Sequence, residues 1–159
     1  MNRTLPLTAI LLGLAGLIPF IGCGLLAMDG DPVMAEHGFT ALIAYAAVIL
    51  SFLGAVHWGL ALSDGAATRR VQRIRYAAGV LPALIGWVAL LAPMFVPAWV
   101  SLVVLLGGFV ATPVAEARGA HLGYVPGRYM AVRWVLSLAV VAVLGCVLIV
   151  RLVGAHVSL

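Results

Sequence analysis

The side chain with the clearest chemical potential is His57, which lies within residues 38–63, a stretch that carries no formal charge. An ionisable group inside a membrane span is costly and is by default a functional-site hypothesis. Two interpretations are open: His57 contacts a ligand or proton, or it is a neutral imidazole hydrogen-bonded to a backbone carbonyl. Pro82 would free such a carbonyl near Ala78, so the structural interpretation has a partner available.

Two charged residues are expected to lie at the same membrane depth as His57. In the topology deduced below, the second span ends after His57, the fourth span ends at Glu116 and the fifth begins at Arg133. Lipid cannot solvate such groups, so they face the bundle interior and pair with one another. Glu116 is the expected partner of His57, and Arg133 is its competitor. With Trp58, these residues form the predicted polar cluster or ligand contact.

The remaining reactive side chains indicate little chemistry. An acidic group before the second span could attract a cation, although a solvated loop explains it better: Asp29, Asp31, Glu36 and His37. A low-spin haem would need two axial ligands, and no other histidine shares a span with His57. The sequence contains no nucleophile–base pair, phosphate loop or metal-spaced cluster. We therefore expect no catalytic residue, metal, cofactor or enzymatic activity.

Two cysteines, Cys23 and Cys146, each lie in an apolar run. Their spacing suits neither a metal site nor a disulfide framework, so we expect two small buried hydrophobic side chains. Lipidation of Cys23 is an alternative, because Arg3 and an apolar stretch precede it as in a lipoprotein signal. The apolar run continues past Cys23 to Met28, which favours a retained first helix.

Only a membrane fold can position these residues. The 159-residue chain is 65% hydrophobic and 9% charged, with a mean hydropathy of +1.21. A soluble domain has about 25% charged and about 45–50% apolar residues. A water-soluble globule and a disordered chain are therefore excluded. Nucleic-acid binding is disfavoured too, because all nine basic residues are arginines that separate apolar runs rather than line a polar face.

Five uncharged stretches predict an all-α bundle of five transmembrane helices in a single membrane domain, residues 1–159. A helix needs about 20 apolar residues to cross the hydrocarbon core. Residues 76–115 would span about 60 Å as one helix, so Pro93 and Pro97 are expected to mark a reversal. Pro19 and Pro113 can kink their spans. The predicted spans are residues 5–28, 38–63, 76–92, 98–115 and 131–151.

The arginines predict the orientation of this bundle. Eight of them fall at the N-terminus or in the second and fourth loops, and only Arg151 falls on the other side. The positive-inside rule then places the N-terminus in the cytoplasm and the C-terminus in the periplasm of a bacterial inner membrane. Four arginines alternate with apolar residues, as in an interfacial segment that contacts anionic lipid headgroups: Arg69, Arg70, Arg73 and Arg75.

Small residues recur every four positions in the second span: Ala47, Ser51, Ala55, Gly59 and Ser63. Small side chains let another helix approach closely in a membrane. Close packing inside the bundle is the favoured interpretation, and a dimer face is the alternative.

Several motifs together resemble one family. They are LAGLIPF at 14–20, YAAVILSFLGAVHWGL at 45–60, LPAL at 81–84 with Trp87, and GYVP at 123–126 with Tyr129 and Arg133. Over nearly its whole length the chain is similar to an uncharacterised family of small integral membrane proteins that includes vertebrate transmembrane protein 69. The resemblance implies a location in an energy-coupling membrane and brings no catalytic residues.

Two functions are therefore expected as alternatives. The first is a non-enzymatic accessory or assembly subunit that packs against a larger membrane complex. The chain is small, and it has more small-residue helix faces than a minimal bundle needs for its own packing. The second is a binder or carrier of a small hydrophobic ligand, a quinone or a lipid, with His57 as the polar contact. The expected partners are the bilayer, anionic headgroups, and a larger complex or a second copy, without nucleic acid.

Overall fold

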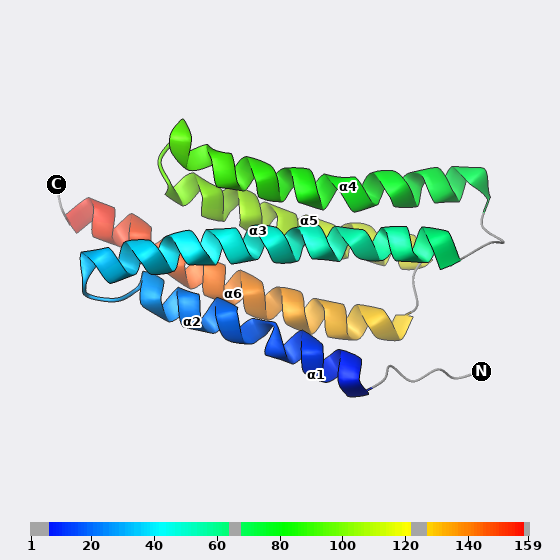
Figure 1. The fold of residues 1–159 in the computed structure, drawn as a ribbon, viewed down its shortest axis with the longest axis horizontal. Coiled ribbons are helices and arrows are strands. Elements are labelled where there is room, and N and C mark those ends of the chain that lie inside the picture. Colours follow the sequence, from blue (N-terminus) through cyan, green and yellow to red (C-terminus); the bar gives the residue numbers. More distant parts are fainter. Residues whose placement is uncertain (1–6, 64–67, 122–126, 158–159) are drawn as a thin grey trace. The chain divides into compact units, whose positions relative to one another are not determined.

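The computed structural model describes residues 7–63, 68–121 and 127–157. These residues form six α-helices and one short 3-10 helix (Figure 1). The elements are α1 (Leu7–Ala15), α2 (Leu17–Ala27), α3 (Pro32–Ser63), α4 (Arg69–Leu91), η1 (Ala92–Met94), α5 (Trp99–His121) and α6 (Gly127–Val157). Over these residues there is no strand, which confirms the all-α prediction. Four segments are long and apolar enough to cross a membrane: Pro32–Gly59, Arg69–Met94, Trp99–Arg118 and Met130–Gly154.

The first predicted span is two helices rather than one. α1 ends at Ala15 and α2 begins at Leu17, and the Gly16 N–H still donates to the Leu12 carbonyl at 3.0 Å. Pro19 lies in the first turn of α2, where its missing N–H leaves the Ala15 carbonyl without a helical donor. The apolar helical stretch here, Leu11–Ala27, is shorter than the four long segments, so its membrane crossing stays a prediction.

The reversal predicted at Pro93 and Pro97 is confirmed. α4 ends at Leu91, η1 follows at once, and α5 begins only at Trp99. The backbone N–H groups of Phe95 and Val96 both donate to the Ala92 carbonyl, at 3.0 and 2.9 Å. Two prolines in one short segment remove the donors that a continuing helix needs, so the chain turns there.

The helices extend beyond the predicted spans because polar residues cap and continue them. α3 begins at Pro32 instead of residue 38, and the Asp31 Oδ1 accepts a hydrogen bond from the Val33 N–H at 2.8 Å. Glu36 and His37 therefore belong to α3, and their assignment to an acidic loop is wrong. α4 likewise begins at Arg69 instead of residue 76. Hydropathy marks where the apolar core ends, whereas a helix ends where its backbone bonds end.

The chain forms two compact units, and the expectation of one membrane domain stays a prediction. Unit 1 comprises Met1–Leu42 and Phe109–Leu159, and unit 2 comprises Ile43–Gly108. In unit 1, α6 packs against both α1 and α2. A Cβ at Gly13 would lie 3.0 Å from Leu136, and one at Gly24 would lie 2.6 Å from Val143. The later glycine faces the later residue of α6, so α1 and α2 run in the same direction as α6.

In unit 2, α3 and α4 approach through glycines. A Cβ at Gly86 would lie 2.9 Å from the Ala47 carbonyl oxygen, and a Cβ at Gly54 would overlap the Gly79 carbonyl oxygen. The buried positions of α4 recur at alternating spacings of four and three residues: Arg75, Gly79, Pro82, Gly86 and Ala89. This is the spacing of a coiled-coil seam. We call this contact the α3–α4 seam.

The predicted small-residue stripe enters this seam only in part. Ala47 is buried and Ser51 is half-buried, but Ala55 and Gly59 are exposed, and no described atom would lie within 4 Å of a Cβ at Gly59. The Ser63 side chain lies outside the described residues. A step of four residues turns about 40° past a full helical turn, so the stripe rotates out of the seam. Ala55 and Gly59 therefore lie outside the α3–α4 seam, and for these two residues both close packing inside the bundle and the dimer face stay predictions.

Candidate functional site

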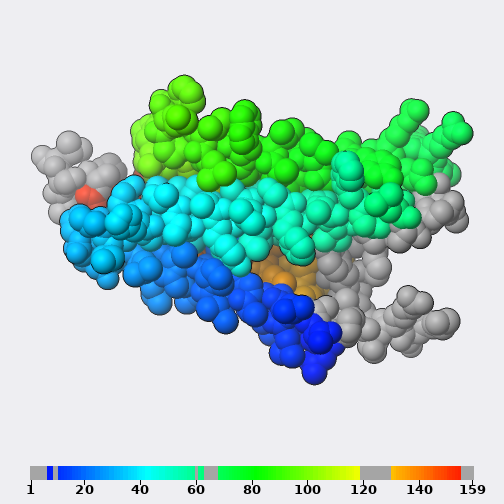
Figure 2. All heavy atoms as spheres, in the orientation of Figure 1, coloured from blue at the N-terminus to red at the C-terminus, as the bar shows by residue number. Residues whose placement is uncertain are grey.

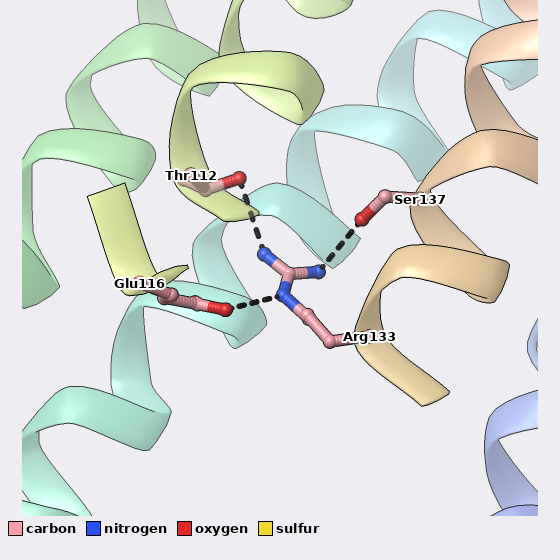
Figure 3. Close-up of polar contacts among 4 residues, drawn as sticks. All are labelled: Thr112, Glu116, Arg133 and Ser137. Carbon is pink, nitrogen blue, oxygen red and sulfur yellow. Dashed lines mark hydrogen bonds and ion pairs between the residues drawn. The ribbon is translucent and has the colours of Figure 1, made fainter. Parts of the chain in front are cut away.

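A buried arginine joins α5 to α6 in unit 1 (Figure 3). The Arg133 Nε donates to the Glu116 Oε2 at 2.8 Å. The Nη2 of the same side chain donates to the Thr112 Oγ1 at 3.1 Å, and the Nη1 donates to the Ser137 Oγ at 3.4 Å. All of the guanidinium nitrogens therefore have an oxygen acceptor. We call these four residues the Arg133 cluster.

Helical spacing brings the members of the Arg133 cluster together. Thr112 and Glu116 are four residues apart on α5, and Arg133 and Ser137 are four apart on α6, so each pair shares one helix face. α5 continues as one helix through Pro113, whose side chain is fully buried. Two short polar stripes thus meet on facing helices.

The cluster is shielded from its surroundings, since Arg133 is 4% exposed and Glu116 is 2% exposed. A charge is costly to remove from water unless it is paired and hydrogen-bonded. The Glu116 carboxylate balances the charge of the guanidinium. The two hydroxyls accept hydrogen bonds from the two terminal nitrogens of the guanidinium. The arrangement supplies charge pairing and directed hydrogen bonds, and it fixes how α5 and α6 face each other.

A second arginine contact lies at the opposite end of α6. Arg151 donates from Nη1 to the Glu36 Oε2 at 2.9 Å and from Nη2 to the Ala35 carbonyl at 3.0 Å. Its guanidinium carbon lies 4.2 Å from the centre of the Phe39 ring. At about 1.5 Å per residue, Arg133 and Arg151 are about 27 Å apart along α6, close to the thickness of a hydrocarbon core. The two contacts therefore mark the two ends of one membrane-length apolar segment.

The structure brings together two of the four residues predicted for the polar cluster, Glu116 and Arg133. Trp58 instead joins α3 to α4, since its indole N–H donates to the Tyr76 carbonyl at 3.1 Å and the two rings pack edge to face at 5.3 Å. His57 is half-buried on α3. It belongs to unit 2 while Glu116 belongs to unit 1, so a His57–Glu116 pair stays a prediction.

Sequence reasoning missed two residues of the Arg133 cluster, Thr112 and Ser137. Each lies four residues from a charged group that the sequence did single out, and that spacing on an apolar helix was the available signal. The Glu36–Arg151 pair was missed because Glu36 was assigned to a loop, although both residues fall on the same predicted side of the membrane.

The predicted lipid-contacting arginines divide into two groups. Arg69, Arg70 and Arg73 are exposed, which suits contact with headgroups. Arg75 is only 6% exposed and lies in the α3–α4 seam positions of α4. Its assignment as a headgroup contact is therefore wrong. Neither cysteine is buried as expected, since Cys23 is half-buried and Cys146 is exposed.

Comparison with known proteins agrees with this membrane architecture. Residues 5–149 match the model of a family described as a protein of unknown function, DUF3429. Transmembrane protein 69 of Xenopus tropicalis is 42% identical over 86 residues, 54% of this chain and 33% of that protein. Its counterpart from Mus musculus is 35% identical over 86 residues, 54% of this chain and 34% of that protein. No solved structure matches the chain.

The chain thus spans about a third of the length of the curated relatives that it matches. The helices, their hydropathy and these relatives together establish a multi-pass membrane protein. The resemblance found in the sequence motifs is confirmed, because the family match covers most of the chain, and the protein belongs to the DUF3429 family.

Proposed function

We propose that this protein is a non-enzymatic accessory subunit of a membrane complex and that it offers one face of α3 to a helix of another membrane protein. The observation that carries the proposal is the exposure of small residues on this apolar helix. Two large exposed side chains, Phe52 and Leu62, lie on or beside the same side of α3. Ala44, Val48, Ala55 and Gly59 are all exposed, and at about 100° per residue they fall within about 60° of one another. We call them the open α3 face.

The open α3 face has the composition of a helix–helix contact. Membrane helices associate through small residues that let their backbones approach, and Ala55 and Gly59 have the spacing of that motif. Glycine also costs about 1 kcal/mol relative to alanine inside a helix. No described neighbouring helix would contact a Cβ at Gly59. A close contact with a second protein explains why glycine, rather than alanine, stands at this position.

Mild-detergent purification followed by native mass spectrometry tests the proposal. We expect the wild type to retain a second membrane protein in a fixed ratio and the Gly59→Leu variant to lose it, because leucine fills the space for the partner helix. Gly107→Leu is the matched control, since Gly107 is equally exposed on α5 with no described atom within 4 Å of its Cβ. Retention of the same protein by both variants, or a wild type that binds none, would contradict the proposal.

We further propose that the protein lies in a bacterial inner membrane with its N-terminus in the cytoplasm. The excess of arginines at the start of α4, near the end of α5 and at the start of α6 supports this orientation. The parallel course of α1, α2 and α6 in unit 1 supports an odd number of crossings, because it directs the N-terminus of α1 and the C-terminus of α6 to opposite ends of that unit.

Reporter fusions test this topology. Alkaline phosphatase fused after Leu159 or after Phe95 is expected to be active, because both sites are placed in the periplasm. The same enzyme inserted between α3 and α4 is expected to be inactive, whereas a green fluorescent protein there is expected to fluoresce. Phosphatase activity between α3 and α4, or fluorescence of a fusion after Leu159, would overturn the orientation.

The alternative function, a binder of a quinone or lipid with His57 as its polar contact, is supported by one observation. His57 is half-buried inside an apolar helix rather than sealed in a core, and because its Nδ1 is buried, the Nε2 is the ring nitrogen proposed to contact the ligand. The same mass spectra separate the two functions. A small molecule that the wild type retains and a His57→Leu variant loses would favour the ligand binder.

A further inference from the structure

The side chains of α4 suggest a binding surface that is independent of the open α3 face. We propose that the outer side of α4 binds an anionic phospholipid, with the phosphate held by Arg69, Arg70 and Arg73 and the acyl chains lying along the apolar residues that follow. Those apolar residues are all exposed: Ile74, Val80, Leu81, Leu84, Trp87 and Val88. We call the arginines and these residues together the outer α4 face.

Helix geometry places the arginines in line with the apolar residues. At about 100° per residue, Arg69, Arg70 and Arg73 fall within an arc of about 100°, and the exposed apolar residues fall within an arc of about 140° that includes it. Arg75 points to the opposite side and is buried. Figure 2 shows α4, in green, at the molecular surface along its length. The three guanidinium groups therefore lie on the side of α4 that faces lipid.

Their depth matches a phosphate layer. From Arg73 to Leu91, where α4 ends, the helix rises about 27 Å, which is close to the thickness of a hydrocarbon core. With the apolar stretch immersed in lipid, the arginines reach the headgroups of one leaflet. Acyl chains and a phosphate of the same molecule can then contact the two parts of the outer α4 face together.

The charges at the start of α4 favour the binding of an anion from outside the protein. The first turn of α4 contains no acidic residue, and no described residue forms an ion pair with Arg69, Arg70 or Arg73. Arginines at the N-terminus of a helix also repel its positive dipole end. A phosphate balances both the unpaired arginine charges and the positive end of the helix dipole, because it accepts paired hydrogen bonds from guanidinium groups and is favoured at helix N-termini. Charge complementarity thus selects an anionic lipid over a zwitterionic one.

Lipid binding to the detergent-solubilised full chain tests this proposal, with native mass spectrometry and thermal unfolding as readouts. We expect phosphatidylglycerol to bind and to raise the melting temperature more than phosphatidylcholine does. The Arg69→Gln/Arg70→Gln/Arg73→Gln variant is expected to lose this preference. The single Arg73→Gln variant is expected to lose about fivefold in affinity, since one arginine near an anionic surface contributes about 1 kcal/mol. Arg118→Gln is the matched control, because Arg118 is an exposed arginine of α5.

Each other outcome decides against the proposal. Equal binding of phosphatidylglycerol by the wild type and the triple variant would place the lipid elsewhere. Equal stabilisation by both lipids would show that charge is not recognised, and equal stabilisation by inorganic phosphate would identify a free-anion site. The melting temperature of each variant without lipid is the control for misfolding. Removing arginines that oppose the α4 dipole is expected to leave this melting temperature unchanged or slightly higher. A lower lipid-free value for the single Arg73→Gln variant would show a structural role and overturn the assignment.

Discussion

Replacing Arg133 by leucine is expected to destabilise the protein by about 3–5 kcal/mol, the cost of breaking a buried ion pair by removing one partner. The variant removes the guanidinium that donates to Glu116 at 2.8 Å inside a nearly sealed contact between α5 and α6. It also removes the donor to Thr112 and Ser137. Thermal or denaturant unfolding in detergent measures the change as a fall in the midpoint.

A double variant separates the ion pair from simple packing. Arg133→Leu/Glu116→Leu is expected to recover much of the lost stability, because apolar residues of similar volume often replace a buried pair without loss. Ser137→Ala is expected to cost less than about 1 kcal/mol, because its hydrogen bond lies within α6 and is the longest in the cluster at 3.4 Å. A double variant as unstable as Arg133→Leu would show that the carboxylate charge is not the cause.

Adding a single methyl group at Gly54 is expected to destabilise the α3–α4 seam by about 1–3 kcal/mol, the usual cost of overpacking. The new Cβ would overlap the Gly79 carbonyl oxygen and lie 3.3 Å from the Pro82 ring. Backbone atoms cannot move aside as the end of a flexible side chain can. The Gly54→Ala variant should therefore unfold at a lower temperature despite the better helix propensity of alanine.

Gly59→Ala provides the matched control on the same helix. No described atom would lie within 4 Å of its Cβ, so the purified single chain should be unchanged or gain up to about 1 kcal/mol from helix propensity. Opposite signs for the two alanine variants are the expected result. Equal losses at Gly54 and Gly59 would mean that both lie in close contacts within the chain.

Hydropathy and prolines were sufficient to predict most of the fold. The long uncharged runs located the four long apolar segments, and Pro93 and Pro97 located the reversal between α4 and α5. The ends of the helices could not be predicted in this way. α3 gains its first turn from Pro32 and the Asp31 cap, and α4 carries its arginines as helical residues, because capping depends on backbone bonds rather than on hydropathy.

The candidate site was predicted less completely because side-chain partners depend on helix rotation. Charge alone identified Glu116 and Arg133, which must be paired somewhere if they are to be buried in a membrane protein. A spacing of four residues identified Ala55 and Gly59 as helix-packing residues, but the α3–α4 seam repeats nearer to every seven residues, through Ala47 and Gly54. The small difference between these periods decides which glycines are buried and which remain open.

The proposal that the open α3 face contacts another membrane protein is tested most directly by photo-crosslinking in native membranes. A benzophenone amino acid replaces Val48 on the open α3 face, and the same substitution at Val103, which is exposed on α5, is the control. We expect irradiation to join the chain to one protein of defined mass at position 48 and to lipid alone at position 103. Lipid adducts alone at both positions, or a product of twice the mass of the chain, would contradict the account.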